Sequence, residues 1–161
     1  MLSLVPMTED EFSTFFETVG ESHARDNIAA GRWNASNAPA LAREETKRLL
    51  PGNEKTPENY LFVLQDIGLK SEIGYLWFGN TTRTTKKVAY LYQLYIHPQF
   101  RRQGYGRQAM FAFEKEALSR GYDALGLHVF ATNGGAHRLY QTVGYTASSI
   151  SMHKELGPSD A

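Results

Sequence analysis

The feature that most constrains the fold is a pair of apolar stretches separated by a segment of helical periodicity. Val88–Ile96 reads V-A-Y-L-Y-Q-L-Y-I and Ala124–Phe130 reads A-L-G-L-H-V-F. Near-continuous apolar runs of this length are typical of strands that are covered on both faces. Between them, Gly104–Gly121 carries apolar residues at helical spacing and ends in a glycine stop. A strand, a helix and a second buried strand in this order predict an α/β domain.

The remaining elements follow from local patterns. Thr8 with Glu11 three residues later is a capping box, which predicts a helix running to about Gly20 and followed by an irregular stretch at 22–37. The other predicted elements are strands at Leu2–Pro6, Tyr60–Gln65, Glu72–Phe78 and Ser149–Glu155, and helices at Ala38–Leu50 and Gly134–Thr142. Together they predict one domain, with a mixed, mostly antiparallel central sheet of six to seven strands flanked by about four helices.

A polar run, T-T-R-T-T-K-K at 81–87, joins two of the predicted strands. It is either a basic patch or the solvated tip of a long hairpin, and the second interpretation is favoured because charged residues commonly protect such tips.

Charge and cysteine content exclude several classes of function. The chain has 161 residues with 17 basic and 17 acidic side chains, whereas a nucleic-acid or anionic-membrane binder needs a basic excess. Without cysteine there is no disulfide, thiolate nucleophile or cysteine metal site. The N-terminus lacks the basic start of a secretory signal, and no apolar run approaches the roughly 20 residues that span a bilayer. We therefore expect a soluble, cytoplasmic protein with no metal and with neither nucleic acid nor a membrane as partner.

The strongest chemical signal is the loop R-R-Q-G-Y-G at 101–106, between a predicted strand and a predicted helix. Its glycines let the backbone turn tightly, and the start of the helix offers unpaired N–H groups with a partial positive charge. Such a site suits a pyrophosphate. By spacing alone, the same loop could be no more than a tight strand-to-helix turn, with its arginines pointing to solvent.

Two other phosphate loops do not fit this segment. A Walker A loop needs Lys-Ser/Thr after its last glycine, but Gly106 is followed by Arg107-Gln108. A dinucleotide fingerprint needs G-x-G-x-x-G, and only one G-x-G is present.

Two segments resemble the GNAT superfamily of N-acetyltransferases. The first, at 91–110, carries Arg101, Gly104 and Gly106 at the spacing of that family's central motif and follows a hydrophobic strand and a His-Pro step. The second, N-G-G-A-H-R-L-Y-Q-T-V-G-Y at 133–145, resembles the family's second coenzyme motif. The resemblance covers about residues 60–156, and two motifs in the right order are far more specific than either alone.

This resemblance implies a fold whose fourth and fifth strands splay apart, with acetyl-CoA in the gap. The pantetheine arm would pair with the backbone of the strand from Leu94 to Ile96. The pyrophosphate would lie on backbone N–H groups of the loop, whose members are Arg101, Arg102, Gln103, Gly104, Tyr105, Gly106 and Arg107.

By the same resemblance, Tyr140 is the predicted catalytic and coenzyme-contacting residue. A phenol with a pKa of about 10 can donate a hydrogen bond or a proton to a departing thiolate, whose thiol has a pKa of about 8.5 by analogy with cysteine. Tyr140 could equally belong to the buried stripe of a short helix, and both roles are compatible. Asn133 is either a coenzyme contact, as the family pattern suggests, or the N-cap of that helix.

The general base is left open by the sequence. The predicted fourth strand carries no acid, since its polar residue is Gln93. The candidates are Glu72 on the preceding strand and Glu21, His23 or Asp26 near the expected acceptor region, with water as an alternative. The spacing of the histidines does not suggest a metal site, and His128, flanked by apolar residues, is expected in the core. The strand aromatics are expected to be core as well, although they could line an acceptor pocket: Tyr75, Trp77, Tyr90, Tyr92 and Tyr95.

The sequence thus predicts an acetyl-CoA-dependent N-acetyltransferase acting by direct attack of a primary amine in a ternary complex. The alternative is a non-catalytic module that senses acyl-CoA, and a different phosphate binder is a third, weaker reading. Residues 1–58 would form the acceptor side and residues 60–156 the coenzyme-binding core. The acceptor is a small-molecule or peptide amine, and a homodimer is possible.

Overall fold

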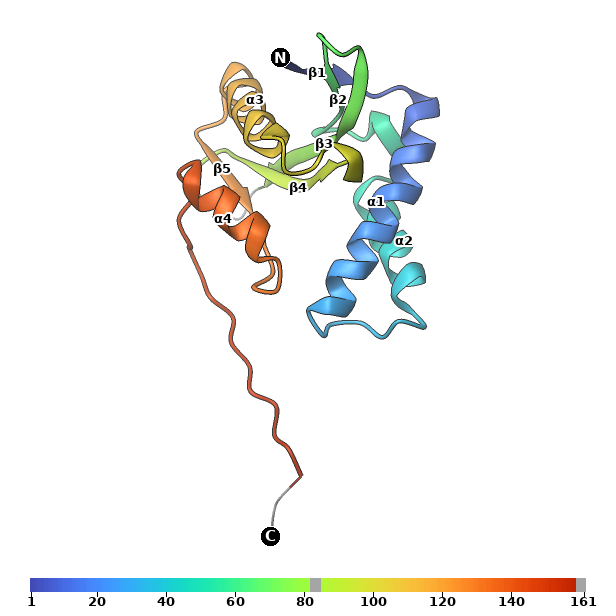
Figure 1. Ribbon diagram of the computed structural model, residues 1–161, viewed down its shortest axis with the longest axis vertical. Coiled ribbons are helices and arrows are strands. Elements are labelled where there is room, and N and C mark those ends of the chain that lie inside the picture. Colours follow the sequence, from blue (N-terminus) through green and yellow to red (C-terminus); the bar gives the residue numbers. More distant parts are fainter. Residues whose placement is uncertain (82–84, 159–161) are drawn as a thin grey trace.

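The structure is a computed structural model that describes residues 1–81 and 85–158. The hairpin run at 81–87 therefore lies partly outside the described residues. The helices and strands, in chain order, are β1 (Leu2–Pro6), α1 (Glu9–Ala29), α2 (Ala38–Leu49), β2 (Asn59–Asp66), β3 (Ser71–Thr81), β4 (Val88–Ile96), α3 (Tyr105–Ser119), β5 (Ala124–Leu127) and α4 (Gly134–Thr142), with 3₁₀ turns at Asn53–Lys55 and Pro98–Phe100 (Figure 1).

The described strands form one mixed sheet in the order β1-β2-β3-β4-β5. The first four strands are antiparallel to their neighbours, and β5 is parallel to β4. The prediction of six to seven strands is wrong, because Ser149–Glu155 forms no strand and every residue in it is exposed. Its alternating sequence suits a strand, but a strand also needs a hydrogen-bonded neighbour, and this segment has none within the described chain.

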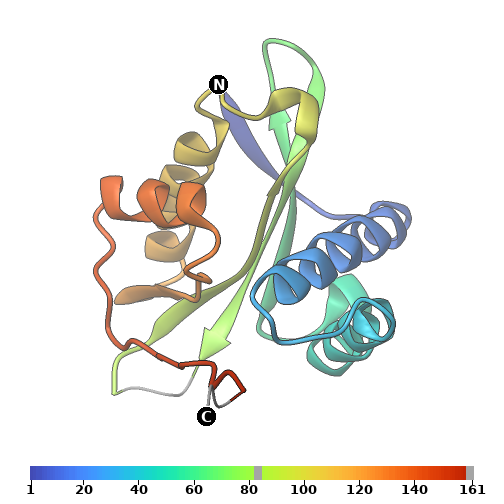
Figure 2. The same cartoon turned by 60° about the horizontal axis from the view of Figure 1, so that its bottom comes forward.

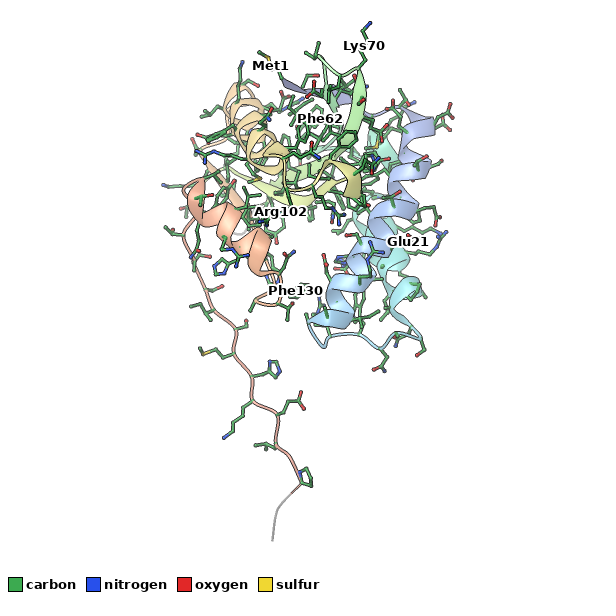
Figure 3. All side chains as sticks on the ribbon, in the orientation of Figure 1. Met1, Glu21, Phe62, Lys70, Arg102 and Phe130 are labelled. Atoms are coloured by element: carbon green, nitrogen blue, oxygen red, sulfur yellow. The ribbon has the colours of Figure 1, made fainter. Side chains whose placement is uncertain are left out.

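Two helical layers cover the sheet (Figure 2). On one face, α3 buries Ala109, Met110 and Phe113 against strand residues, and α4 packs beside it. Figure 3 shows Phe62 in the interior between the sheet and α3. On the other face, α1 buries Phe12, Phe15 and Val19 against β2 and β3. The four predicted helices are therefore confirmed, and they place the sheet between two cores.

The first helix is longer than predicted. The capping box is confirmed, since the Thr8 hydroxyl accepts from the Glu11 N–H at 3.3 Å and the Glu11 carboxylate accepts from the Thr8 N–H at 2.8 Å. The helix does not stop at Gly20 but continues to Ala29. An interior glycine costs about 1 kcal/mol relative to alanine. Packing of the extra turns against α2, through small residues such as Ala24 and Ala42, outweighs that cost.

A β-bulge bends β4 away from β5. Leu91 pairs with Phe78 and Gln93 pairs with Trp77, which leaves Tyr92 as an extra residue in β4. A bulge of this kind bends its strand and sharpens the local twist. The parallel pairing of β4 with β5 ends at the same place, at Leu91 with Leu127. The expected splay of strands four and five is present, and β5 ends at Leu127 rather than at the predicted Phe130.

Among the residues that the structure describes, no helix combines the length and apolar character needed to cross a bilayer.

Candidate active site

A cavity of about 600 Å³ opens where β4 and β5 part. Its walls come from α1 and α2 on one side, and from β4, the segment after β5 and α4 on the other. Of the residues predicted to bind coenzyme or catalyse, Leu94, Asn133 and Tyr140 line it. The size falls within the range of small-molecule and cofactor sites, about 300 to 1,000 Å³. The split in the sheet therefore leaves a cavity large enough for a small molecule or cofactor.

Tyr140 reaches the cavity from α4, where it is partly buried. Burial raises the pKa of its phenol above the ordinary value, and the negative charge of Asp26 raises it further. The hydroxyl therefore stays protonated at neutral pH. Tyr140 can act as a hydrogen-bond or proton donor to a group inside the cavity.

Asp26 faces the same cavity from α1. Burial raises the pKa of its carboxyl, while the positive charges of His23, Arg25 and Arg101 oppose that rise. A carboxylate whose pKa is raised by burial is a stronger base than an exposed one. The cavity thus holds a proton acceptor on one wall and a proton donor on another, a pairing typical of active sites.

The other candidates for the base are placed less well. His23 lines the cavity, but its Nε2 lies 3.2 Å from a Glu45 carboxylate oxygen and its Nδ1 lies 3.4 Å from the Asn27 amide nitrogen. Both ring nitrogens therefore already have a polar partner within hydrogen-bond distance. Glu72 pairs with a histidine outside the cavity lining, His97, at 3.0 Å. Glu21 is exposed on α1 and lies in a different groove.

The glycine loop has the backbone geometry predicted for it. Gly104 adopts φ +84° as the N-cap of α3, and Arg102 adopts φ +62°. No side chain caps the helix, so the first N–H groups of α3 keep their capacity to bind an anion. Packing also favours glycine at position 106, since a Cβ there would lie 3.0 Å from the Leu139 Cδ2 of α4.

Several side chains of the loop stabilise the loop itself. Arg101 Nε donates to the Ile96 carbonyl at 2.8 Å, and its guanidinium lies 5.3 Å from the centre of the Tyr95 ring. The Gln103 amide donates to the Gln99 carbonyl at 2.9 Å. A ligand would therefore meet mostly backbone from these residues, and Ile96 lies outside the cavity lining with its carbonyl already bonded.

The remaining loop residues divide between core and surface. The Tyr105 side chain is buried, and its hydroxyl donates to Asp66 Oδ2 at 2.8 Å, so only its backbone is available to a ligand. The Arg107 guanidinium lies 5.5 Å from the centre of the Phe111 ring, and Arg102 is exposed (Figure 3).

Asn133 is the N-cap of α4, because its side-chain oxygen accepts from the Ala136 N–H at 3.2 Å. It also lines the cavity. The capping role is confirmed, and the coenzyme contact stays a prediction.

Some aromatic residues of the sheet lie in the core, and others also lie at the cavity. Tyr75 and Tyr95 are buried in the core, whereas Trp77, Tyr90 and Tyr92 also line the cavity. The expectation of a core histidine is wrong: His128 is exposed, because its strand ends one residue earlier.

Sequence reasoning placed residues 1–58 on the acceptor side but named no residue of α2, which supplies Glu45, Thr46 and Arg48 to the cavity wall. Only a weak sequence pattern pointed to these residues. Glu45 and Arg48 share one face of a helix by i, i+3 spacing, but polar residues on a helix face normally indicate only solvent exposure.

Comparison with known proteins identifies the family of the chain. Residues 14–145 match the model of the acetyltransferase (GNAT) family. Two Bacillus subtilis proteins named as uncharacterized N-acetyltransferases, YycN and YdgE, are each 30% identical to the chain over 96% of its length, and the match covers 99% and 98% of their lengths. The crystal structure of YycN superposes with a TM-score of 0.92, covering 98% of this chain and 100% of that one. A structure from Pyrococcus furiosus, 21% identical and with a TM-score of 0.72, covers 97% of this chain and 100% of that one and shares the fold.

Proposed function

Because the chain belongs to the acetyltransferase (GNAT) family, we propose that it transfers an acetyl group from acetyl-CoA to a primary amine by direct attack in a ternary complex. One observation carries the proposal beyond the family: Tyr140 and Asp26 face one cavity at the split between β4 and β5, with opposite proton roles.

The chain offers suitable groups for acetyl-CoA. The N–H groups at the start of α3 would bind the pyrophosphate, with Arg102 adding positive charge from the surface. Beyond Leu91, β4 has no strand partner on its β5 side, so backbone near Leu94 is available to the amides of the pantetheine arm. Acetyl-CoA supplies the thioester carbonyl that the amine attacks, and the residues around the cavity manage the protons.

Asp26 is the proposed acceptor of the amine proton. A free alkylammonium, with a pKa of about 10, is too weak an acid to give its proton fully to a carboxylate. The amine therefore attacks in its neutral form, after losing one proton to water. Its nitrogen becomes much more acidic as its lone pair enters the new C–N bond, and Asp26 can then take a second proton directly or through water. The raised pKa of this carboxyl favours that transfer.

Tyr140 is the proposed donor to the departing sulfur. Ordinary pKa values of about 10 for the phenol and 8.5 for the thiol make full transfer uphill by about 2 kcal/mol, and burial adds to that cost. The charge of Asp26 is one cause of the raised phenol pKa. When Asp26 becomes protonated that charge disappears, so Tyr140 becomes a better acid at the moment when the sulfur leaves. The two residues would therefore act in sequence.

In this proposal α1 and α2, within residues 1–58, form the acceptor wall of the cavity, opposite α4 and the segment after β5. The acceptor is a small-molecule or peptide amine.

The test is release of free thiol from acetyl-CoA with a panel of amines: small amines, amino acids, polyamines, aminoglycosides and a peptide. The proposal predicts turnover with at least one acceptor and a large loss in the Tyr140→Phe variant. Saturable acetyl-CoA binding without turnover on any acceptor would favour the acyl-CoA sensor instead.

A further inference from the structure

The end of α1 places one arginine, Arg32, in the wall of the cavity. Gly31 adopts φ +75°, and its N–H donates to the Ile28 carbonyl at 3.0 Å. The Arg32 N–H donates to the Asn27 carbonyl at 2.9 Å. These two bonds form a Schellman motif, whose left-handed position favours glycine. The motif ends the helix and fixes the backbone of Arg32 at the cavity.

The side chain of Arg32 is held in place as well. Its Nη1 donates to the Asn27 Oδ1 at 2.8 Å, and Asn27 is fully buried. The Asn27 amide nitrogen donates in turn to the His23 carbonyl at 2.8 Å. The guanidinium carbon lies 5.5 Å from the centre of the Trp33 ring and 6.0 Å from that of Phe130, which Figure 3 shows beside the end of α1. Arg32 is exposed, yet these contacts restrict a side chain that normally has many conformations.

Arg32 has no acidic partner among the residues that the structure describes. The one hydrogen bond of its side chain goes to a neutral amide and uses one of the five guanidinium N–H groups. The Nε–H and Nη2–H groups remain, and such a pair binds a carboxylate through two parallel hydrogen bonds. A positioned guanidinium with unused donors is therefore available to a ligand in the cavity.

The charges of the cavity are separated from one another. Asp26, the proposed proton acceptor, forms no ion pair within residues 1–81 and 85–158, and Arg32 is not among the charges that shift its pKa. The other carboxylate in the lining, Glu45, already lies 3.2 Å from the His23 Nε2. The cavity thus has one carboxylate and one held guanidinium, each without an ionic partner in the described chain.

An acceptor that carries both an amine and a carboxylate matches this separation of charge. A polyamine would instead bring a second ammonium into a cavity that Arg32 and Arg48 also line, and like charges repel. We propose that the acceptor is a free amino acid, whose amine receives the acetyl group and whose carboxylate binds Arg32. This inference rests on the proposed transfer function and names its acceptor class.

The reaction leaves the carboxylate unchanged. The amine nitrogen bonds to the acetyl carbon as the C–S bond breaks, which gives an N-acetyl amino acid and CoA. Of the two protons that the ammonium loses, water takes one and Asp26 the other, while Tyr140 protonates the sulfur.

The first test compares amino acids with their amides, in which a neutral group of similar size replaces the carboxylate. Thiol release from acetyl-CoA gives kcat/KM for both members of each pair. The ratio of acid to amide is compared between wild type and Arg32→Gln, so that differences in amine reactivity cancel. Loss of the charged fork should lower this ratio by a factor of about 10 to 100, mainly through the KM of the acid. Arg32→Lys keeps the charge without the fork and should lower the ratio less.

Arg25→Gln is the matched control. Arg25 is exposed on the same helix, carries the same charge and lies in a different groove, so its loss should leave the ratio unchanged. Glutamine at position 32 keeps an N–H donor for Asn27, and an unchanged melting temperature would show that α1 still ends normally. Amine turnover with the same ratio in wild type and Arg32→Gln would overturn the amino-acid assignment and leave the transfer function intact.

A second test measures binding and does not depend on turnover. N-acetylated amino acids, which are the predicted products, and their amides are titrated calorimetrically into the chain in the presence of CoA. The inference predicts that at least one acid binds more tightly than its amide by a factor of about 10 or more, and that Arg32→Gln removes this preference. Equal affinities of acids and amides across the panel would overturn it, whether or not acetyl transfer is observed.

Discussion

At the scale of residues, three charged or ionisable groups on different elements influence one another across the cavity. Asp26 on α1 raises the pKa of Tyr140 on α4, and Arg101 in the glycine loop lowers the pKa of Asp26. These charge effects connect α1, α4 and the glycine loop. The sequence pointed to Tyr140 through the family motif, but it left Asp26 as one of four candidates for the base. Only the length of α1 beyond Gly20 brings Asp26 to the cavity.

We expect Tyr140→Phe to lower kcat by a factor of about 100 to 10,000, the usual contribution of a positioned acid. The ring remains, so packing and the KM for acetyl-CoA should change little. Steady-state thiol release measures both constants. Tyr145→Phe is the matched control, because its buried hydroxyl has no hydrogen-bond partner among the described residues and its ring lies 5.9 Å from that of Tyr140. Equal losses of kcat in the two variants would contradict a specific catalytic role for Tyr140.

The pH dependence of kcat/KM should report Asp26. Because burial raises the pKa of this carboxyl, the base form is present above that raised value and is lost as pH falls through it. Asp26→Asn should lower kcat/KM by a factor of about 100 or more at neutral pH and remove the acidic limb. Glu21→Gln, exposed on the same helix, should keep the wild-type profile.

The same Asp26→Asn substitution should not lower stability, although it should lower activity. A carboxyl with a raised folded-state pKa contributes stability only in its protonated form, and that contribution is lost as pH rises through the folded value. Ionised Asp26 therefore disfavours folding at pH 7, and Asp26→Asn should melt at the same temperature as wild type or higher. A lower melting temperature with a proportionate loss of activity would indicate a structural role for Asp26.

At the scale of elements, the ends of helices and strands were harder to predict than their existence. The apolar run at 88–96 predicted the bounds of β4. The bulge at Tyr92 could not be predicted, because the run is apolar at nearly every position and its pattern does not change there. Because β4 bends there, β5 loses its partner and ends at Leu127 instead of Phe130. The prediction of a final strand was wrong for a related reason. Sequence alternation at Ser149–Glu155 reports a suitable residue pattern, whereas pairing depends on another strand being within reach.

The start of α3 depends on Gly104. At φ +84° an L-residue pays about 1 to 2 kcal/mol, although a Cβ there would meet no atom within 4 Å. Gly104→Ala should therefore lower the free energy of unfolding by about that amount and weaken acetyl-CoA binding, as denaturant titration and a binding isotherm would show. Gly135→Ala in α4 also has free space but no positive φ, and should be neutral or stabilising by up to about 1 kcal/mol. If both variants have the same stability, the loop geometry is not what requires Gly104.

At the scale of the whole molecule, the cavity lies where α1, α2 and α4 meet the split between β4 and β5. The family motifs within residues 60–156 predicted the family and the split between strands four and five, because these motifs contain glycines at fixed spacing that are recognisable in a sequence. The cavity wall formed by α1 and α2 has no such motif, since its polar side chains come together only in the fold. The balanced charge of the chain does not identify the acceptor either, because the charge of a pocket can differ from the total.

Acetyl-CoA should stabilise the whole fold by mass action. At 100 times its dissociation constant the ligand adds about 2.7 kcal/mol, which for a domain of this size raises the melting temperature by about 5 to 10 °C. ATP at the same concentration should give a smaller shift, because Gly106 is followed by Arg107 rather than by the Lys-Ser/Thr of an ATP loop. Equal shifts with both ligands would indicate a general phosphate site.

The most direct measurement is equilibrium dialysis of radiolabelled acetyl-CoA against the purified chain, because the amount bound is counted without relying on heat or turnover. We predict saturation at one acetyl-CoA per chain, in competition with unlabelled CoA and weakened by Gly104→Ala. A chain that retains no label at millimolar acetyl-CoA would contradict acetyl-CoA binding at the β4–β5 split, and with it the proposed transfer reaction.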